Sequence, residues 1–184
     1  MIDEIRRMRR VADLLITCHC ILRDRFDRRA VLLDVFLLIG SLLVAVLALS
    51  SAEIRRVILG DIIRTDSAIG LVGLLLFALS VVSIRVDWAH RGALHGEAAK
   101  AYASLKLDAS QMLGDPASQT QAQFDALQAQ FKMIGTHSIP VPEKEFNKLK
   151  KKHLMKQAVS RLLDTKPAAS LWLTRIKLWW RDNF

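Results

Sequence analysis

The sequence predicts an all-α membrane protein, in which a two-span transmembrane helical hairpin carries a cytoplasmic helical bundle and the chain assembles as an oligomer. Residues 35–52 and 67–84 form two runs of 18 residues without a charge. Each run would make a helix about 27 Å long, close to the ~30 Å of a hydrocarbon core. No segment alternates apolar and polar residues as a half-buried strand does. With flanking interfacial residues, we expect spans over about 31–52 and 67–85, within a hairpin of residues 30–86.

Composition narrows the class of protein further. The 184 residues are 52% hydrophobic and 24% charged, and the charges crowd outside the two apolar runs. Such hydrophobicity excludes a disordered chain, and a count of only two cysteines excludes a disulfide-rich secreted scaffold. A cleavable signal peptide is a poor interpretation of the first run, because a charged segment of about thirty residues precedes it.

The distribution of basic residues predicts the topology. Residues 1–29 hold eight arginines, the connection 53–66 holds three basic and three acidic residues, and residues 85–184 hold sixteen basic residues. By the positive-inside rule, both termini are expected to be cytoplasmic. The net charge of +9 is then mainly a matter of topology and of contact with anionic lipid, so direct nucleic-acid binding is not expected.

Helical periodicity continues on the cytoplasmic side. Within the basic N-terminal segment 1–29, apolar residues recur at steps of three and four over 5–26, which favours a helix packed on the cytoplasmic domain over one lying on the membrane. The second span has no helix breaker at its end, so we expect one helix to continue through 86–113, the start of a helical domain covering 87–165. Gly114-Asp115-Pro116 should stop that helix, with Asp115 as the N-cap of the next one.

Two further helices and a tail are expected. The first has an apolar seam at steps of three, four and three, formed by Phe124, Leu127, Phe131 and Ile134. After an extended connection over 135–142, a lysine-rich helix over 143–163 offers apolar contacts at Phe146, Leu149, Leu154 and Leu162. A short linker, 164–167, leads to the tail.

The tail, 168–184, contains three of the four tryptophans, Trp172, Trp179 and Trp180, together with basic residues. It fits an amphipathic helix in the lipid headgroup layer. It fits equally a docking helix against the bundle or a neighbouring subunit, because its apolar positions extend far round the helix.

No pattern of catalysis or metal binding is present. The sequence lacks a phosphate-binding loop, a GxSxG elbow and paired carboxylates at an informative spacing. On a helix, the side chains of Cys18, His19 and Cys20 diverge by about 100° per residue, and those of His90 and His95 by about 140°, so neither set converges on one ion. We therefore expect no enzyme activity, no metal site and no cofactor.

Two sets of residues in the spans are candidates for function. Asp34 is an ionisable residue near the interior of the first span. One interpretation places its side chain at the level of the headgroups, where it reaches water or an arginine, Arg28 or Arg29, of a neighbouring helix. The other interpretation is a residue at a pore mouth or at a contact between subunits. Small residues suited to close helix packing lie on the second span: Gly70, Gly73, Ser80 and Ser83. Two spans cannot enclose a water path, so any pore would need several copies of the chain.

Three segments carry a family resemblance over about residues 5–165. They are Asp87-Trp88-Ala89-His90, then His95-Gly96-Glu97-Ala98-Ala99-Lys100-Ala101-Tyr102, and last Ile139-Pro140-Val141-Pro142, which precedes Phe146. In this order, after a basic helix and a two-span hairpin, they resemble the SLATT family, two-span membrane effectors of bacterial anti-phage systems, including CBASS-like ones.

The resemblance implies a homo-oligomer in the bacterial inner membrane that opens or disrupts the lipid bilayer and arrests the cell during infection. The signal would come from a separate protein or from a nucleotide second messenger. Five residues near the exit of the second span are candidates for cytoplasmic packing or signal reception: Trp88, His90, Arg91, His95 and Tyr102.

The leading hypothesis is thus a pore-forming or otherwise membrane-permeabilising effector used in abortive infection. A membrane-anchored adaptor, which recruits a cytosolic partner through the basic helical domain, is the first alternative. A membrane protein that tethers nucleic acid is the second.

Overall fold

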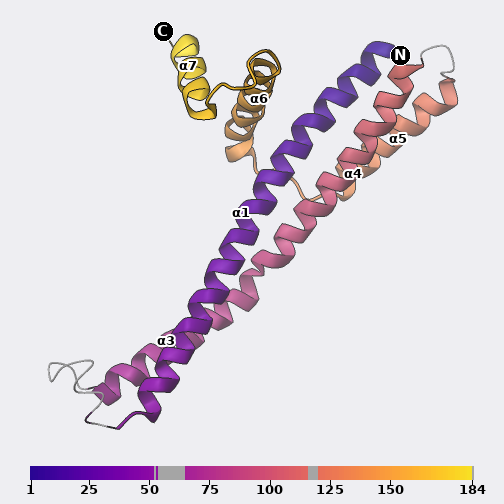
Figure 1. Cartoon of the computed structure of the whole chain (residues 1–184). Helices are drawn as coiled ribbons and strands as arrows, with labels where there is room; N and C mark the ends of the chain where they lie inside the picture. Colours follow the sequence, from indigo (N-terminus) through magenta and orange to yellow (C-terminus); the bar gives the residue numbers. More distant parts are fainter. Residues whose placement is uncertain (52, 54–64, 116–119, 184) are drawn as a thin grey trace. The chain divides into compact units, whose positions relative to one another are not determined.

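The computed structural model describes residues 1–51, 53, 65–115 and 120–183 (Figure 1). In these residues every regular element is an α-helix, as the sequence predicts, and no strand is present. The helices are α1 (Ile2–Leu49), α3 (Thr65–Val86), α4 (Trp88–Gly114), α5 (Gln121–His137), α6 (Glu143–Thr165) and α7 (Leu171–Asn183).

The chain divides into two compact units. One, here called the helical unit, comprises Met1–Leu22 and Leu94–Phe184; the other, the hairpin unit, comprises Arg23–Ala93. Helix α1 contributes to both, since the basic N-terminal segment and the first apolar run form one helix of 48 residues. The boundaries between the units therefore fall inside α1 and α4, whereas α3, α5, α6 and α7 each belong to one unit.

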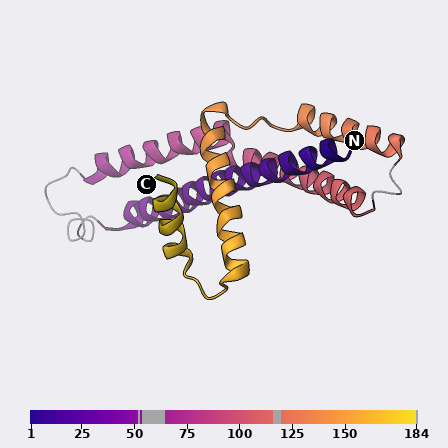
Figure 2. The same cartoon turned by 90° about the horizontal axis from the view of Figure 1, so that it is seen from above.

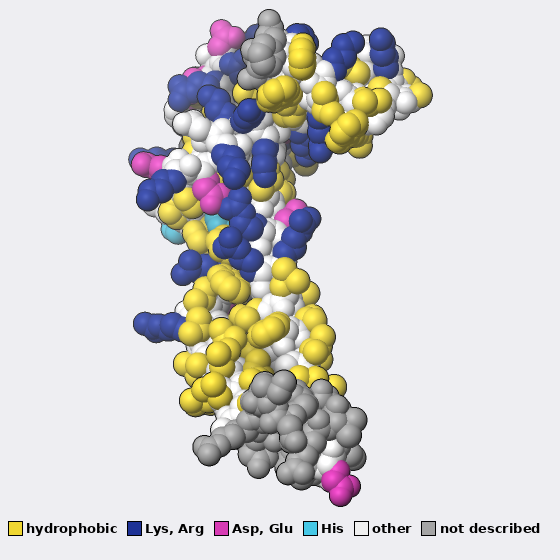
Figure 3. Space-filling view, turned by 90° about the vertical axis from the view of Figure 1, so that its left-hand side faces the viewer, with side chains coloured by type: hydrophobic (Ala, Val, Ile, Leu, Met, Phe, Trp, Pro, Cys, Tyr) yellow, Lys and Arg dark blue, Asp and Glu magenta, His cyan; other side chains and the backbone are white. Residues whose placement is uncertain are grey.

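The hairpin unit contains two helical segments, in α1 and α3, that are long and apolar enough to cross a membrane. In the 18-residue apolar stretch of each segment, only 6% of the residues are buried. Figure 3 shows hydrophobic side chains gathered on the surface of this part of the chain. A soluble protein would bury such helices in its core. This exposure therefore supports the predicted spans.

The two segments approach each other closely at Gly40. A Cβ atom at Gly40 would lie 2.9 Å from the Leu76 Cδ2 atom, inside van der Waals contact. Leu76 is accordingly buried, with 8% of its surface exposed. The absence of a side chain at Gly40 thus lets α1 receive Leu76.

The predicted uninterrupted helix through 86–113 is wrong at one residue. Asp87 has a φ of 46°, which ends α3 at Val86 and starts α4 at Trp88. Aspartate tolerates this left-handed conformation better than most residues because its short side chain bonds locally. Here the Asp87 carboxylate accepts a hydrogen bond of 3.1 Å from the backbone N–H of His90, and so caps the first turn of α4.

The core of the helical unit lies between α1, α4 and α5. Its buried members are Ile5, Met8, Ala12, Tyr102, Leu105, Ala109, Leu127 and Ile134, and Phe124 and Phe131 pack against them partly buried. The predicted packing of the N-terminal helix on the helices that follow the second apolar run and the predicted seam of α5 are both confirmed. Period-three and period-four spacing succeeded here because both helices bury a single face.

The start of α5 differs from the sequence prediction. Its N-cap is Thr120, not Asp115, and the cap is a reciprocal pair in which Thr120 Oγ1 accepts from the Gln123 N–H while the Gln123 side chain accepts from the Thr120 N–H. Pro116, expected at the first helical position after an Asp115 cap, lies outside the described residues. At its other end α5 continues to His137, so the first three residues of the segment expected to be extended are helical.

Helices α6 and α7 lie side by side (Figures 1 and 2). Helix α6 buries Leu149, His153 and Val159, whereas Leu154, expected as an apolar contact, is 52% exposed. Leu154 lies about 140° from Leu149 round the helix, and so faces away from the packed side.

Candidate functional site

A groove between α1 and α3 brings together three of the residues predicted to act in the spans. Asp34, Gly73 and Ser80 all line it, with Leu37, Leu38, Ser41, Val44, Ala45, Leu76 and Phe77. The lining is apolar except for one carboxylate and two hydroxyl groups. The groove is thus an apolar surface on which one carboxylate and two hydroxyl groups are placed.

The polar groups of the groove differ in whether they have hydrogen-bond partners. Ser41 Oγ donates a hydrogen bond of 3.0 Å to the backbone oxygen of Leu38, one turn earlier in α1. The Asp34 carboxylate, by contrast, is exposed and makes no hydrogen bond or ion pair with another described residue of its own chain. A contact of Asp34 with Arg28 or Arg29 from another copy therefore stays a prediction.

The other small residues of the spans lie outside the groove. Gly70 has no atom within 4 Å of an added Cβ, and Ser83 is half-buried but does not line the groove. Sequence reasoning missed Gly40 and Ser41, although their adjacency within a run of Leu, Val and Ile was a signal of close helix packing.

A second close approach in the hairpin unit occurs where α4 begins. A Cβ atom at Gly92 would collide with the Asp27 carboxylate, and would lie 3.6 Å from the Phe26 Cβ atom. The sequence feature that identifies this position is the Gly92-x-x-x-Gly96 pattern. Of the predicted signal residues nearby, Trp88 is half-buried, and His90 and Arg91 are exposed.

In the helical unit the structure joins two other predicted residues, His95 and Tyr102, to His19. The His19 and His95 Nδ1 atoms are 2.9 Å apart, and the Tyr102 ring stacks on His19 with centroids 5.7 Å apart. All three are buried, with exposed fractions of 1%, 2% and 4% for His19, His95 and Tyr102. Because one Nδ1 must donate and the other accept, the hydrogen bond requires at least one of the facing nitrogens to be unprotonated.

Burial sets the charge of this histidine pair. Loss of hydration lowers the pKa of His19 to about 4, with a smaller contribution from the neighbouring His95, and burial also lowers the pKa of His95. Both rings are therefore neutral at neutral pH. The neighbouring Cys18 is likewise buried, which raises the pKa of its thiol, so it is protonated and a poor nucleophile.

A polar network ties α6 to α1 and α4. Thr17 Oγ1 lies 2.9 Å from His153 Nδ1, and the Gln157 amide donates to Asp13 Oδ2 at 3.1 Å. Lys106 Nζ contacts Asp13 Oδ1 at 2.6 Å. Partial burial tends to raise the pKa of Asp13, but Lys106, Gln157 and His153 together lower it below its usual value. The network holds α6 by directional contacts in addition to its apolar face.

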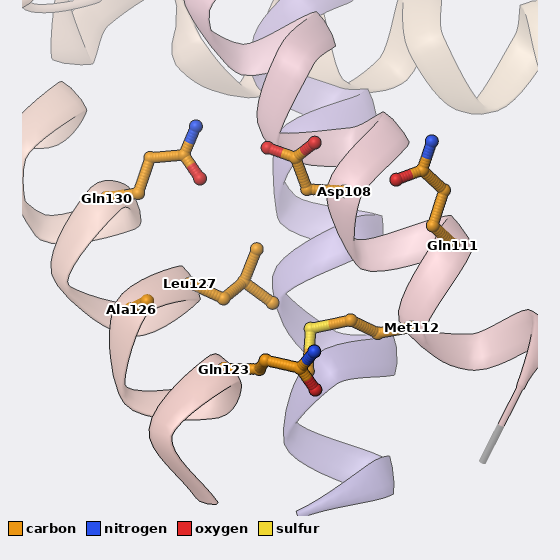
Figure 4. Close-up of a pocket in the computed structure, with 7 residues that line it drawn as sticks. All are labelled: Asp108, Gln111, Met112, Gln123, Ala126, Leu127 and Gln130. Atoms are coloured by element: carbon orange, nitrogen blue, oxygen red, sulfur yellow. The ribbon is translucent and has the colours of Figure 1, made fainter. Parts of the chain in front are cut away.

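A groove between α4 and α5 is shown in Figure 4. Asp108, Gln111 and Met112 come from α4, and Gln123, Ala126, Leu127 and Gln130 from α5. The lining offers several amides and one carboxylate but no cation, so it disfavours an anionic nucleotide ligand. Within the described part of the chain, no group of three His, Cys, Asp or Glu side chains is placed to hold a metal ion.

Helix α7 carries the three tail tryptophans on its exposed side. Trp172, Trp179 and Trp180 are 69%, 46% and 62% exposed, whereas Thr174 and Leu178 are 5% and 4% exposed.

Comparison with known proteins adds no assignment. No protein-family model matches the chain, and the searches of curated proteins and of solved structures found no match.

Proposed function

We propose that this chain is the membrane effector of a bacterial anti-phage system, which assembles from several copies and permeabilises or depolarises the inner membrane when a separate protein or a nucleotide signal activates it. The observation that carries the membrane part of the proposal is the groove of the hairpin unit, in which Asp34, Ser41 and Ser80 lie among apolar side chains. The defence role rests on the resemblance to the SLATT family.

The groove supports assembly for an electrostatic reason. A carboxylate in contact with acyl chains loses its hydration, which is costly, so ionisable residues in spans face water, a partner charge or another protein surface. Asp34 makes no such contact with a described residue of its own chain. Several hairpins arranged with their grooves toward a common axis would give these carboxylates a wet environment, and would line that axis with the hydroxyl groups of Ser41 and Ser80.

The helical unit supports a receiving role. The buried pair of His19 and His95 and the network around Asp13 are specific polar contacts within an apolar bundle. Such contacts favour one arrangement of helices over others. A signal that binds this unit and alters its helix packing would act on α1, which continues from the helical unit into the hairpin unit.

The test is inducible expression in bacteria with a potential-sensitive dye, in cells that contain the activating partner. We expect rapid depolarisation with the wild-type chain and at least a tenfold slower response with Asp34→Leu, which removes the carboxylate. Glu97→Gln, an exposed substitution outside the spans, is the matched control and should behave as wild type. An intact potential under full activation would contradict the proposal.

A second arm separates an effector from an adaptor. Both spans are replaced by unrelated spans of equal length. A membrane-anchored adaptor would keep its effect on the cell, whereas a permeabilising effector would lose it.

A further inference from the structure

We propose that α7 binds the headgroup layer of an anionic membrane through the face that it turns away from α6. This interaction surface is distinct from the two spans and does not require pore formation. It consists of five apolar side chains, here called the tryptophan face: Trp172, Leu173, Ile176, Trp179 and Trp180.

Helix geometry separates two faces of α7. At about 100° per residue, Thr174 and Leu178 lie close together, and they are the two buried side chains among residues 171–181 of this helix, which packs on α6. The tryptophan face covers an arc of about 120° centred opposite to them. Its members are 42% to 69% exposed, from Ile176 to Trp172.

This separation explains the broad apolar distribution in the tail. Leu178 is buried, so it does not count against a membrane-binding face. Of the other apolar residues of α7, those from Trp172 to Trp180 form a single arc, as in helices that lie in the interface, and only Leu171, at the first position of the helix, lies outside it, on the side of Leu178. Three of its five members are tryptophans, whose amphipathic rings favour the level of the headgroups.

The charges beside the arc match an anionic surface. Arg175 and Lys177 lie about 40° beyond its two edges, where their side chains can extend past the apolar residues toward phosphate groups. Six lysines of α6, at 144, 148, 150, 151, 152 and 156, are exposed as well. Residues 143–184 contain eleven basic and four acidic residues, a net charge of +7. Basic segments of this kind are attracted to anionic lipid.

Other binding partners would complement only part of the tryptophan face and its flanking charges. A second copy docking through the same face would bring Arg175 and Lys177 against their equivalents, with like charges opposed. A nucleic acid would neutralise the cations but leave Leu173 and Ile176 in water. An anionic headgroup layer accepts the apolar arc and the flanking cations together.

The experiment uses the full-length chain with Trp88→Phe, so that the three tail tryptophans supply all the tryptophan fluorescence. The protein is reconstituted into phosphatidylcholine bilayers, and into bilayers that also contain phosphatidylglycerol. Brominated lipid quenches tryptophan fluorescence. It is placed either in the bilayer that contains the protein or in vesicles that are added separately. In the anionic lipid we expect a blue-shifted emission and at least twofold stronger quenching, both reduced by added salt.

Charge reversal tests the role of the flanking cations. Arg175→Glu with Lys177→Glu should abolish the lipid-dependent shift. Lys100→Glu with Lys132→Glu, which alters two exposed lysines on α4 and α5 and changes the net charge equally, should leave it intact. Far-ultraviolet circular dichroism of both variants checks that they keep their helices.

Three results would overturn the inference. The first is identical emission in neutral and anionic bilayers. The second is a shift that follows protein concentration in both lipids, which would assign the face to a second copy. The third is a shift produced by an added oligonucleotide but not by anionic lipid. None of these results would affect the depolarisation assay, so the two proposals fail separately.

Discussion

The two ends of α1 place similar apolar side chains in opposite environments. Near its N-terminus, Ile5, Met8 and Leu22 are 0% to 4% exposed, packed within the helical unit. Near its C-terminus, Leu38 and Leu42 are 68% and 63% exposed on the hairpin unit. Burial within the protein stabilises the first region, whereas the second requires an apolar solvent, which a bilayer provides. One helix therefore combines a globular interface with a proposed span.

The largest effect expected from this comparison concerns the core of the helical unit. Leu105→Ala removes a side chain that is 0% exposed, and should lower the free energy of unfolding by about 2–5 kcal/mol through lost burial and a residual cavity. Leu42→Ala, the matched change on the hairpin surface, should leave the unfolding of the helical unit unchanged. Thermal unfolding in detergent, followed by circular dichroism, compares the two. Equal losses would show that the exposed residues also pack within one chain.

The next effect concerns the hairpin unit alone. Leu42→Arg places a charge near the centre of the first proposed span and should oppose insertion by about 3 kcal/mol. The measurement is the fraction of chain that resists alkaline extraction from membranes. The same substitution at Leu107, an exposed residue of α4 in the helical unit, is the control and should not alter membrane association. Full retention of the Leu42→Arg variant in the membrane would contradict the span.

Acid should weaken the helical unit through the histidine pair. The pKa of His19 is lowered from 6.5 to about 4 on folding, so between these values the unfolded chain binds more protons than the native one. Stability should therefore fall as the pH drops from 6.5 to about 4, by up to about 3 kcal/mol, and the contribution of His19 should not change further below that range. Chemical unfolding at a series of pH values measures the slope.

His19→Asn removes the titrating ring, so it should strongly reduce the dependence of the free energy of unfolding on pH between 6.5 and about 4. Asp13 acts in a separate window, because its pKa is lowered below 3.8 and its stabilising contacts are lost only as the carboxylate is protonated under more acidic conditions. A pH slope that is unchanged in His19→Asn would assign the effect to other groups.

The smallest effect concerns a helix end. Thr120→Ala removes the side-chain oxygen that accepts from the Gln123 N–H, and should destabilise the helical unit by about 1 kcal/mol. Thr120→Ser retains the acceptor and should restore most of that loss. Denaturant midpoints of the two variants, compared with wild type, test the reciprocal cap. A variant Asp115→Ala should have no comparable effect, since Asp115 does not cap α5.

Local periodicity accounts for most of what could be predicted from the sequence. The apolar runs of α1 and α3, the N-terminal stripe and the seam of α5 each depend on spacing within one helix, where geometry follows directly from residue number. The end of α4 at Gly114 was predictable for the same reason. Helix ends without such a signal were less predictable. The break at Asp87 depends on a side-chain cap and a left-handed backbone, and the helix-forming residues on both sides of Asp87 indicate a continuous helix instead.

The candidate sites divide in the same way. His95 and Tyr102 were identifiable as neighbours because seven residues separate them on one helix. Their partner His19 lies 76 residues from His95, and no spacing rule connects such positions. Gly40 was missed because a glycine within an apolar run carries no information about which side chain approaches it; here that side chain is Leu76.

The sequence by itself determined the helical class of this protein, the two apolar segments and their separation from the basic regions, because charge and hydrophobicity act locally along the chain. Only the tertiary structure decided which residues from distant segments meet. It paired His19 with His95, gathered Asp34, Gly73 and Ser80 in one groove, and buried Leu178 while leaving the tryptophans of α7 exposed. The physical reason is that each of these arrangements depends on how two helices rotate against each other, which the composition of neither helix specifies.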